Sequence, residues 1–321
     1  MAVLTGTDLL DAARDGDRRA LARLITVVER GGEDARTVGR AAHGLAGSAY
    51  TVGITGAPGA GKSTLTNRLV AAIRARHHRT AVLAIDPSSP FTGGAVLGDR
   101  VRMGDHSADE GVFIRSMATR GHLGGLSVAA PEAVRVLDAV GFEWILIETV
   151  GVGQVEVEVA GAADTTVVVV NPGWGDAVQA AKAGLMEVAD IFVVNKADRP
   201  GVADTRRDLE QMLDLSAHPA EGEAWWRPPI LATCAESGDG VRELWAAIEE
   251  HRGHLLDSGG LEVRRAERRR SELDAVVRAW LEEEARRRTA GVDRDEVAQA
   301  VAEGDLDPWT AAERLLGPLT P

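Results

Sequence analysis

Two patterns of apolar and polar positions alternate along the middle of the chain. Short continuous apolar runs are typical of buried strands, and longer segments with apolar residues about every three or four positions are typical of amphipathic helices. The predicted strands are residues 51–55, 81–85, 145–147, 166–170, 191–194 and 230–233. The predicted helices are residues 130–140, 178–188, 205–213 and 241–251. This alternation predicts an α/β fold with a mainly parallel sheet covered by helices on both faces.

Helical patterns without strands flank this central region. Residues 1–45 carry two amphipathic segments, and a polar, glycine-containing break follows them at residues 31–34. Their apolar positions are Leu9, Leu10, Ala13, Leu21, Leu24, Ile25 and Val28. Residues 262–288 are rich in Arg and Glu and have one apolar face, which consists of Leu273, Val276, Val277, Trp280 and Leu281. A final helical pair, residues 295–318, is broken at residues 304–308 and offers Trp309 as a packing anchor.

A glycine-rich loop connects the first predicted strand to a helical pattern. It has the G-x-x-x-x-G-K-[ST] spacing and consists of Gly56, Ala57, Pro58, Gly59, Ala60, Gly61, Lys62, Ser63 and Thr64. In such a loop the glycines let backbone N–H groups turn toward phosphates, Lys62 adds a positive charge, and the Ser63 hydroxyl can ligate Mg²⁺. We therefore predict a site for a nucleoside triphosphate.

Two later loops indicate the base. Asn195, Lys196 and Asp198 form an N-K-x-D sequence after the strand predicted at residues 191–194. The Asp198 carboxylate can accept hydrogen bonds from N1–H and the N2 amine of guanine, whereas adenine lacks this pair of donors. A loop after residues 230–233 resembles the S-A-K loop of GTPases, whose backbone N–H groups reach guanine O6. It consists of Cys234, Ala235 and Glu236, with Cys234 at the usual serine position.

These motifs divide the chain into three predicted parts. They are an N-terminal helical segment, residues 1–45; a P-loop GTPase domain, residues 46–256; and a helical C-terminal extension, residues 257–321. Within the GTPase domain, Glu148 ends a strand and can hold Mg²⁺, while the N–H of Gly151 can sense the γ-phosphate. Many GTPases carry a water-orienting Gln directly after this glycine, but this chain has Val152. We therefore expect slow hydrolysis until another segment or a partner completes the site.

Several longer segments resemble the MeaB/ArgK GTPases. They are residues 86–94, 97–103, 120–126, 148–154 and 172–176, together with Gln179 and Lys182. The resemblance extends over about residues 15–256. It implies a G-protein chaperone that gates cofactor delivery to an adenosylcobalamin-dependent acyl-CoA mutase, methylmalonyl-CoA mutase above all. Such a chaperone also protects the working mutase and helps to exchange damaged cofactor.

The resemblance assigns further site residues. It implies that Asp86 and Asp99 also coordinate Mg²⁺, with Asp99 in the first switch region, and that Glu148 and Gly151 belong to the second. A third switch, characteristic of this family, completes the expected catalytic set of Lys62, Glu148, Asp176, Gln179 and Lys182. Residues 172–175 form a turn that can change shape, so Lys182 can supply transition-state charge when a partner docks. A solvent-exposed lysine on a helix face is the alternative.

The resemblance also implies partners. Besides the mutase, we expect a homodimer held by the C-terminal helices, a functional link to the adenosyltransferase, and no tightly bound cobalamin on this chain. GTP and GDP are the expected substrate and product, with Mg²⁺ as the metal. The sequence leaves open whether the mutase acts on methylmalonyl-, isobutyryl-, ethylmalonyl- or 2-hydroxyisobutyryl-CoA.

Composition narrows the location and the partners. The 321 residues include 36 Lys and Arg against 49 Asp and Glu, a net charge of -13 that predicts no attraction to nucleic acid or to a membrane surface. A single cysteine excludes an internal disulfide and suits the reducing cytosol. The N-terminus lacks the pattern of a secretory signal, and no stretch approaches the ~20 apolar residues of a membrane span. We expect a cytoplasmic protein.

Two other functional classes share parts of this pattern. A metallochaperone GTPase for nickel-enzyme maturation has the same phosphate and N-K-x-D loops, but it needs a Cys/His cluster to carry its metal. Here the histidines contain only the adjacent pair His77 and His78, and the one cysteine is Cys234. A transport-associated kinase would transfer phosphate to a protein rather than to water. The guanine motif argues against a kinase, and comparing GTP turnover with ATP turnover separates a kinase from a GTPase.

Overall fold

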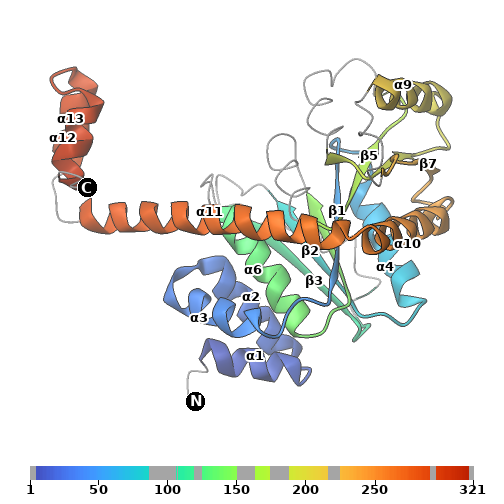
Figure 1. Ribbon diagram of the computed structural model, residues 1–321, viewed down its shortest axis with the longest axis horizontal. Helices are drawn as coiled ribbons and strands as arrows, with labels where there is room; N and C mark the ends of the chain where they lie inside the picture. Colours follow the sequence, from blue (N-terminus) through green and yellow to red (C-terminus); the bar gives the residue numbers. More distant parts are fainter. Residues whose placement is uncertain are drawn as a thin grey trace. The chain divides into compact units, whose positions relative to one another are not determined.

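A seven-stranded parallel sheet forms the centre of the structure, a computed structural model shown in Figure 1. The strands are β1 Tyr50–Gly56, β2 Thr80–Asp86, β3 Val112–Ala118, β4 Trp144–Thr149, β5 Thr165–Val170, β6 Ile191–Asn195 and β7 Ile230–Thr233, in the spatial order β3-β2-β4-β1-β5-β6-β7. The structure describes residues 5–86, 106, 108–118, 125–149, 163–173, 188–215, 225–289 and 294–317. Within the described ranges, no helix is long and apolar enough to cross a membrane.

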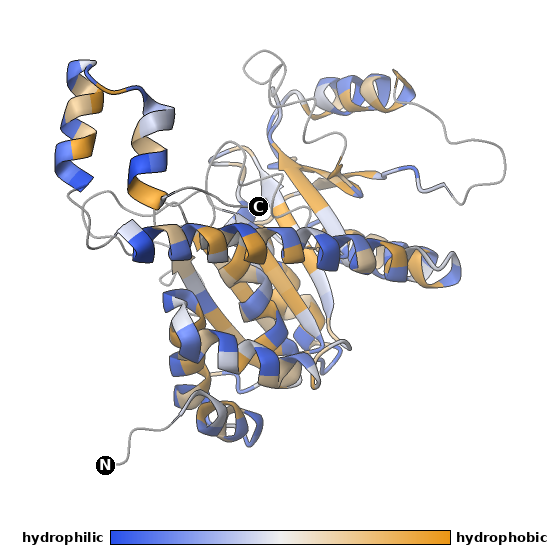
Figure 2. Ribbon diagram, turned by 60° about the vertical axis from the view of Figure 1, so that its left-hand side comes forward, coloured by the Kyte–Doolittle hydropathy of each residue, from blue (hydrophilic) through white to orange (hydrophobic). Residues whose placement is uncertain are grey.

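Helices cover both faces of the sheet. The helices of this part are α1 Gly6–Arg14, α2 Arg18–Arg30, α3 Gly32–His43, α4 Lys62–Arg74, α6 Gly125–Ala139, α9 Val202–Leu215 and α10 Val241–Asp257. One apolar cluster joins α1, α2, α3 and α6 to one face of β2, β3 and β4, and a smaller one joins α9 to β5 and β6. A third cluster joins α4 and α10 to the opposite face, and Figure 2 shows the strands largely in the hydrophobic colour. The predicted α/β fold is therefore confirmed.

One strand of the sheet and one of the helices that cover it were not predicted. Strand β3 lies at the edge of the sheet, and the polar residues Arg115 and Ser116 interrupt its apolar run. Helix α3 follows the predicted break, so the N-terminal segment has three helices rather than two. Its buried face uses small side chains, Ala35, Val38, Gly39 and Ala42, which give a weak periodic signal. The helix predicted at residues 178–188 lies, except for its last residue, outside the described residues.

The chain forms two compact units, Met1–Arg269 and Arg270–Pro321, and the long helix α11, Gly260–Thr289, begins in the first and continues into the second. The predicted three-part division of the chain stays a prediction. The second unit also contains α12, Arg294–Glu303, and α13, Pro308–Leu316, which pack against each other as the predicted pair. Asp307 caps α13 by accepting hydrogen bonds from the backbone N–H groups of Trp309 and Thr310. Trp309 is 83 % exposed in the single chain, so its role as a packing anchor stays a prediction.

Arginines in the first turns of α11 anchor this helix at the amino-terminal ends of the strands. Arg265 donates to both carboxylate oxygens of the fully buried Asp164, at 3.1 and 2.8 Å, and Arg268 adds a bond of 3.1 Å. Arg264 makes a similar fork with Asp190, at 2.9 and 2.8 Å. Burial alone would raise the pKa of Asp164, but the hydrogen bond from Arg265 and the two positive charges outweigh it and lower that pKa. The start of α11 is thereby fixed to the sheet at the end opposite to the phosphate loop.

Candidate nucleotide-binding site

The phosphate loop takes its shape from two glycines that no other residue could replace without a clash. Gly56 ends β1 with a φ of 131°, and a Cβ there would lie 2.0 Å from the carbonyl oxygen of Val169 on β5. Gly61 precedes α4 with a φ of 90°, and its Cβ would lie 2.4 Å from Nδ2 of Asn195. Left-handed backbone of this kind costs little only for glycine. The loop is consequently pressed against β5 and β6, at the carboxyl ends of the strands, where ligands bind in such sheets.

Lys62 opens α4 and is almost fully buried. Its Nζ donates to the carbonyl oxygens of Gly56 and Ala57, at 2.6 and 3.1 Å. The ammonium group therefore lies within the loop, beside the backbone that would surround the phosphates. The N-terminus of α4 adds the positive end of the helix dipole at the same place. The arrangement of loop and lysine fits the polyphosphate anion that the sequence predicts.

Ser63 and Glu148 meet beside this loop. The Ser63 hydroxyl donates to Oε1 of Glu148 across 2.5 Å, although the two residues lie on different elements, α4 and β4. Glu148 is fully buried, and it reaches this position because β4 pairs with β1, with Ile54 opposite Glu148. A hydroxyl and a carboxylate are hard oxygen ligands of the kind that Mg²⁺ prefers. The donor set at this point therefore fits the magnesium ion that the sequence predicts.

Asn195 connects three loops of the site. From the end of β6 its Nδ2 donates to the carbonyl of Ala60 in the phosphate loop at 2.7 Å. Its Oδ1 accepts hydrogen bonds from the Thr233 hydroxyl and from the backbone N–H of Ala235, at 3.0 and 3.1 Å. Asn195 is 2 % exposed, so all of these bonds are shielded from water. The side chain that the N-K-x-D motif places first thus holds the phosphate loop and the loop after β7 in fixed positions.

The rest of the N-K-x-D motif lies over the phosphate loop. Lys196 has a φ of 60°, rare for a residue with a side chain, and its Nζ donates to the carbonyl of Gly59 at 2.6 Å. Asp198 is exposed, and its Oδ1 accepts a hydrogen bond from the Cys234 thiol at 3.4 Å. The N-K-x-D loop and the loop after β7 therefore face each other, as two sides of a site for one base must.

One residue that the sequence analysis missed connects α4 to the loop after β7. The guanidinium of Arg68 donates through Nε to the carbonyl of Ala235 at 3.0 Å and through Nη2 to the carbonyl of Glu236 at 2.6 Å. Nothing in the sequence distinguishes this arginine from the many on exposed helix faces. Only the fold brings it to the loop.

Several predicted site residues lie outside the described part of the chain. They are Asp99, Gly151, Asp176, Gln179 and Lys182. Asp86 ends β2, next to β4, but its side chain is also outside the described part. The roles predicted for these six residues stay predictions.

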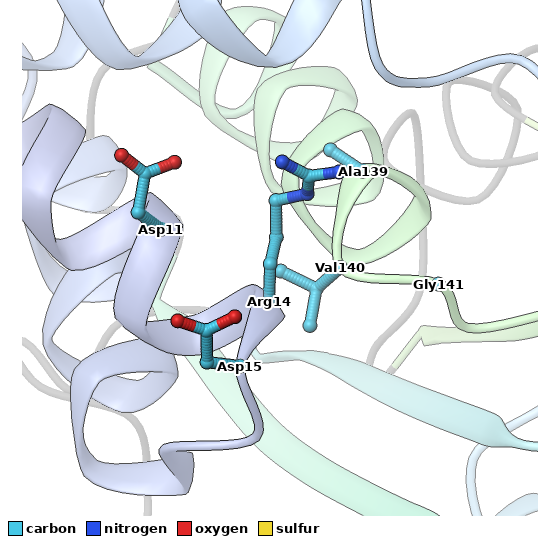
Figure 3. A pocket seen from close by; sticks show the side chains of 6 residues that line it. All are labelled: Asp11, Arg14, Asp15, Ala139, Val140 and Gly141. Atoms are coloured by element: carbon cyan, nitrogen blue, oxygen red, sulfur yellow. The ribbon is translucent and has the colours of Figure 1, made fainter.

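A pocket of about 470 Å³ lies elsewhere in the larger unit (Figure 3). Asp11, Arg14 and Asp15 line it from α1 and the turn after it, and residues 139–141 line it from the end of α6 and the turn that follows. None of the residues predicted for the nucleotide site lines this pocket. Its residues 139–141 precede the start of β4, whereas Glu148 lies near the carboxyl end of that strand. The pocket and the phosphate loop are therefore at opposite ends of the sheet.

Comparison with known proteins identifies the family. The family described as methylmalonyl Co-A mutase-associated GTPase MeaB matches residues 21–290. The chain belongs to the MeaB family. The predicted resemblance is thus confirmed, and membership makes the chain a GTPase whose nucleotide is a guanine nucleotide.

Relatives of this MeaB-family chain cover most of its length. A putative GTPase of Pyrococcus abyssi is 49% identical over 96% of this chain and 95% of the relative. The mouse protein named methylmalonic aciduria type A homolog, mitochondrial, is 38% identical over 67% of this chain and 52% of its own length. The solved structure of a LAO/AO transport system kinase is 28% identical, covers 98% of both chains and superimposes with a TM-score of 0.70.

Proposed function

We propose that this protein is a GTP-hydrolysing chaperone of an adenosylcobalamin-dependent acyl-CoA mutase such as methylmalonyl-CoA mutase. In this proposal it gates delivery of the cofactor to the mutase and protects or reactivates the working enzyme. The family description, a mutase-associated GTPase, and the name of the mouse relative support the link to the mutase. A functional link to the adenosyltransferase that makes the cofactor belongs to the same proposal, as do a cytoplasmic location and the lack of tightly bound cobalamin on this chain.

The observation that carries the hydrolytic part is the contact between Ser63 and Glu148 beside the phosphate loop. In the proposal both oxygens hold Mg²⁺, together with Asp86 and Asp99. When bound, this ion would neutralise charge on the β- and γ-phosphate oxygens. Lys62 and the loop N–H groups bind the same phosphates, and Asp198 selects guanine.

Hydrolysis by the isolated chain is slow in this account, because Val152 occupies the position of the usual water-orienting Gln. The third switch supplies what is missing when the mutase docks. Asp176 and Gln179 help to form the completed site, and Lys182 stabilises negative charge on the transferring phosphoryl group. Binding of the mutase is thereby coupled to loss of the γ-phosphate.

We further propose that the active species is a homodimer. The apolar face of α11 supports this, because its side chains are largely exposed to solvent: Leu273, Val276, Val277, Trp280 and Leu281. Trp309 on α13 is exposed as well. A second copy of the chain would cover these apolar side chains, and large exposed apolar patches commonly mark such interfaces.

The chaperone role is tested by following mutase turnover until the enzyme loses activity. In the presence of free adenosylcobalamin, the protein with GTP should slow this loss or restore the activity. Lys62→Ala, which removes the phosphate-binding charge, should do neither. If wild type and Lys62→Ala leave every acyl-CoA mutase tested with the same loss of activity, the chaperone role is wrong.

The name of the solved relative, a transport system kinase, makes phosphate transfer to a protein a second candidate. The two reactions differ in where the γ-phosphate goes. With γ-labelled GTP, a GTPase releases the label as inorganic phosphate, whereas a kinase leaves it on a protein. The proposed function requires release to water.

A further inference from the structure

Arg68, a residue outside the nucleotide-binding motifs, contacts the loop after β7. Arg68 lies on α4, the helix that begins at Lys62. Its guanidinium binds two consecutive carbonyls, those of Ala235 and Glu236, at 3.0 and 2.6 Å. The arginine is itself exposed, and so is Glu236, whereas Ala235 is 3 % exposed. A single planar, charged group therefore fixes two neighbouring peptide units of the loop.

Fixing these carbonyls also fixes two N–H groups. A trans peptide is planar, so its N–H points away from its C=O. The carbonyl of Ala235 shares a peptide with the N–H of Glu236, and the carbonyl of Glu236 shares one with the N–H of Ser237. Among the residues that the structure describes, neither N–H has an acceptor within hydrogen-bond distance. Arg68 thus directs two available donors to the side of the loop opposite to α4.

Several other backbone N–H groups of this loop already have partners. The N–H of Ala235 donates to Asn195, that of Cys234 to the carbonyl of Asp239, and that of Gly238 back to the carbonyl of Cys234. The loop is thus held from β6 through Asn195 and from α4 through Arg68. The positive charge of Arg68 also polarises the two peptides that it binds, which strengthens their N–H groups as donors.

We propose that Arg68 is a positioning residue for guanine recognition: it orients the N–H groups of Glu236 and Ser237 toward the O6 acceptor of the base. The inference rests on the guanine-nucleotide site described above. It also connects the helix that carries Lys62 and Ser63 to the loop that contacts the base. Arg68 touches no phosphate-loop residue in these contacts, so it acts on nucleotide affinity rather than on the chemical step.

The test compares GDP with the diphosphate of 2-aminopurine riboside, which keeps the N2 amine but lacks O6 and the proton on N1. Isothermal titration in Mg²⁺ buffer gives both dissociation constants for wild type, Arg68→Ala and Arg68→Lys. For Arg68→Ala we expect GDP to bind about tenfold more weakly, the scale of a lost charge-assisted hydrogen bond. The analogue should bind almost equally to wild type and to Arg68→Ala, because its interaction through O6 is missing in both. Arg68→Lys keeps the charge but not the forked guanidinium, so its affinity for GDP should lie between those of wild type and Arg68→Ala.

Arg76→Ala is the matched control. Arg76 lies just beyond the end of α4 and pairs with Glu249 on α10 at 3.4 Å, not with the loop after β7. This variant should bind GDP as wild type does.

Three results would overturn the inference: unchanged GDP affinity in Arg68→Ala, an equal loss for GDP and the analogue, or a loss of the same size in Arg76→Ala. Failure of the underlying guanine-nucleotide site would be seen separately, because wild type itself would then bind no GDP.

Discussion

Oγ of Ser63 donates a hydrogen bond to Oε1 of Glu148 across 2.5 Å, and this contact joins the start of α4 to the carboxyl-terminal part of β4. The two residues were each predicted, from separate motifs, to bind the same metal ion. The fold brings them together because β4 is the direct neighbour of β1. Their contact is the geometric basis for the first prediction.

Glu148→Gln should raise the Mg²⁺ concentration needed for half-maximal GTP turnover by about 10- to 100-fold, the scale seen when a metal site loses a supporting group. An amide is a poorer ligand than a carboxylate for a hard cation. The measurement is turnover as a function of Mg²⁺. Glu143→Gln, just before the start of β4, is the control and should leave the curve in place. An unchanged curve for Glu148→Gln would show that Glu148 does not help to bind Mg²⁺.

Asp198→Asn should reduce the preference for guanine over adenine nucleotides. The amide cannot accept hydrogen bonds from both N1–H and the N2 amine, so GDP binding should lose about 1–3 kcal/mol. Calorimetric titration with GDP and ADP in Mg²⁺ buffer measures both affinities. Equal affinities for the two nucleotides in the wild-type protein would refute the assignment of Asp198.

Asn195→Ala should weaken both nucleotide binding and folding, because it leaves three buried groups without their partner. We expect the free energy of unfolding to fall by about 2–4 kcal/mol, since each unsatisfied buried group costs on the order of 1–3 kcal/mol. Thr233→Val removes only one of the three hydrogen bonds and should cost about 1 kcal/mol. Urea unfolding measures both changes. Equal losses for the two variants would contradict the view that Asn195 holds three loops together.

Folding stability should fall as the pH drops from about 6.5 to about 4, in part through His251. Burial, together with the charges of Arg264 and His254, lowers the pKa of His251 to about 4, against an opposing effect of Asp190. Its Nε2 lies 3.3 Å from Oδ1 of Asp190, and its Nδ1 lies 2.8 Å from the Thr165 hydroxyl. The unfolded chain therefore takes up a proton at a pH where the folded chain does not. Protonation then favours unfolding by up to ~3 kcal/mol.

His251→Gln should flatten this part of the stability curve. Thermal unfolding at several pH values between 4 and 7 measures the slopes. If His251→Gln keeps the wild-type slope, other groups account for the acid sensitivity.

Much of the site could be predicted from sequence because its motifs are local and have fixed backbone requirements. Gly56 and Gly61 are needed for positive φ and close approach, and Lys62 and Ser63 follow them on the same turn of chain. The strands that end at Glu148 and Asn195 were visible as continuous apolar runs, since both faces of the sheet are covered. A parallel sheet then places all these strand ends at one edge.

The features that were missed depend on packing between distant segments. Edge strand β3 is covered less fully, and its Arg115 pairs with Glu29 on α2 at 3.1 Å, so its sequence lacks a continuous apolar run. Arg68 has no signature because its partners are backbone carbonyls, and a carbonyl leaves no trace in a sequence.

The central claim, a GTPase whose hydrolysis is completed by its mutase, is tested most directly by steady-state GTP turnover with and without the purified acyl-CoA mutase. Wild type and Lys182→Ala are measured side by side. We predict that the mutase accelerates wild type, and that Lys182→Ala keeps its basal rate but loses most of the acceleration, because Lys182 acts only when the partner orders the third switch. Full stimulation of Lys182→Ala would leave Lys182 as an exposed lysine on a helix face. A wild-type rate that no acyl-CoA mutase changes would contradict the account as a whole.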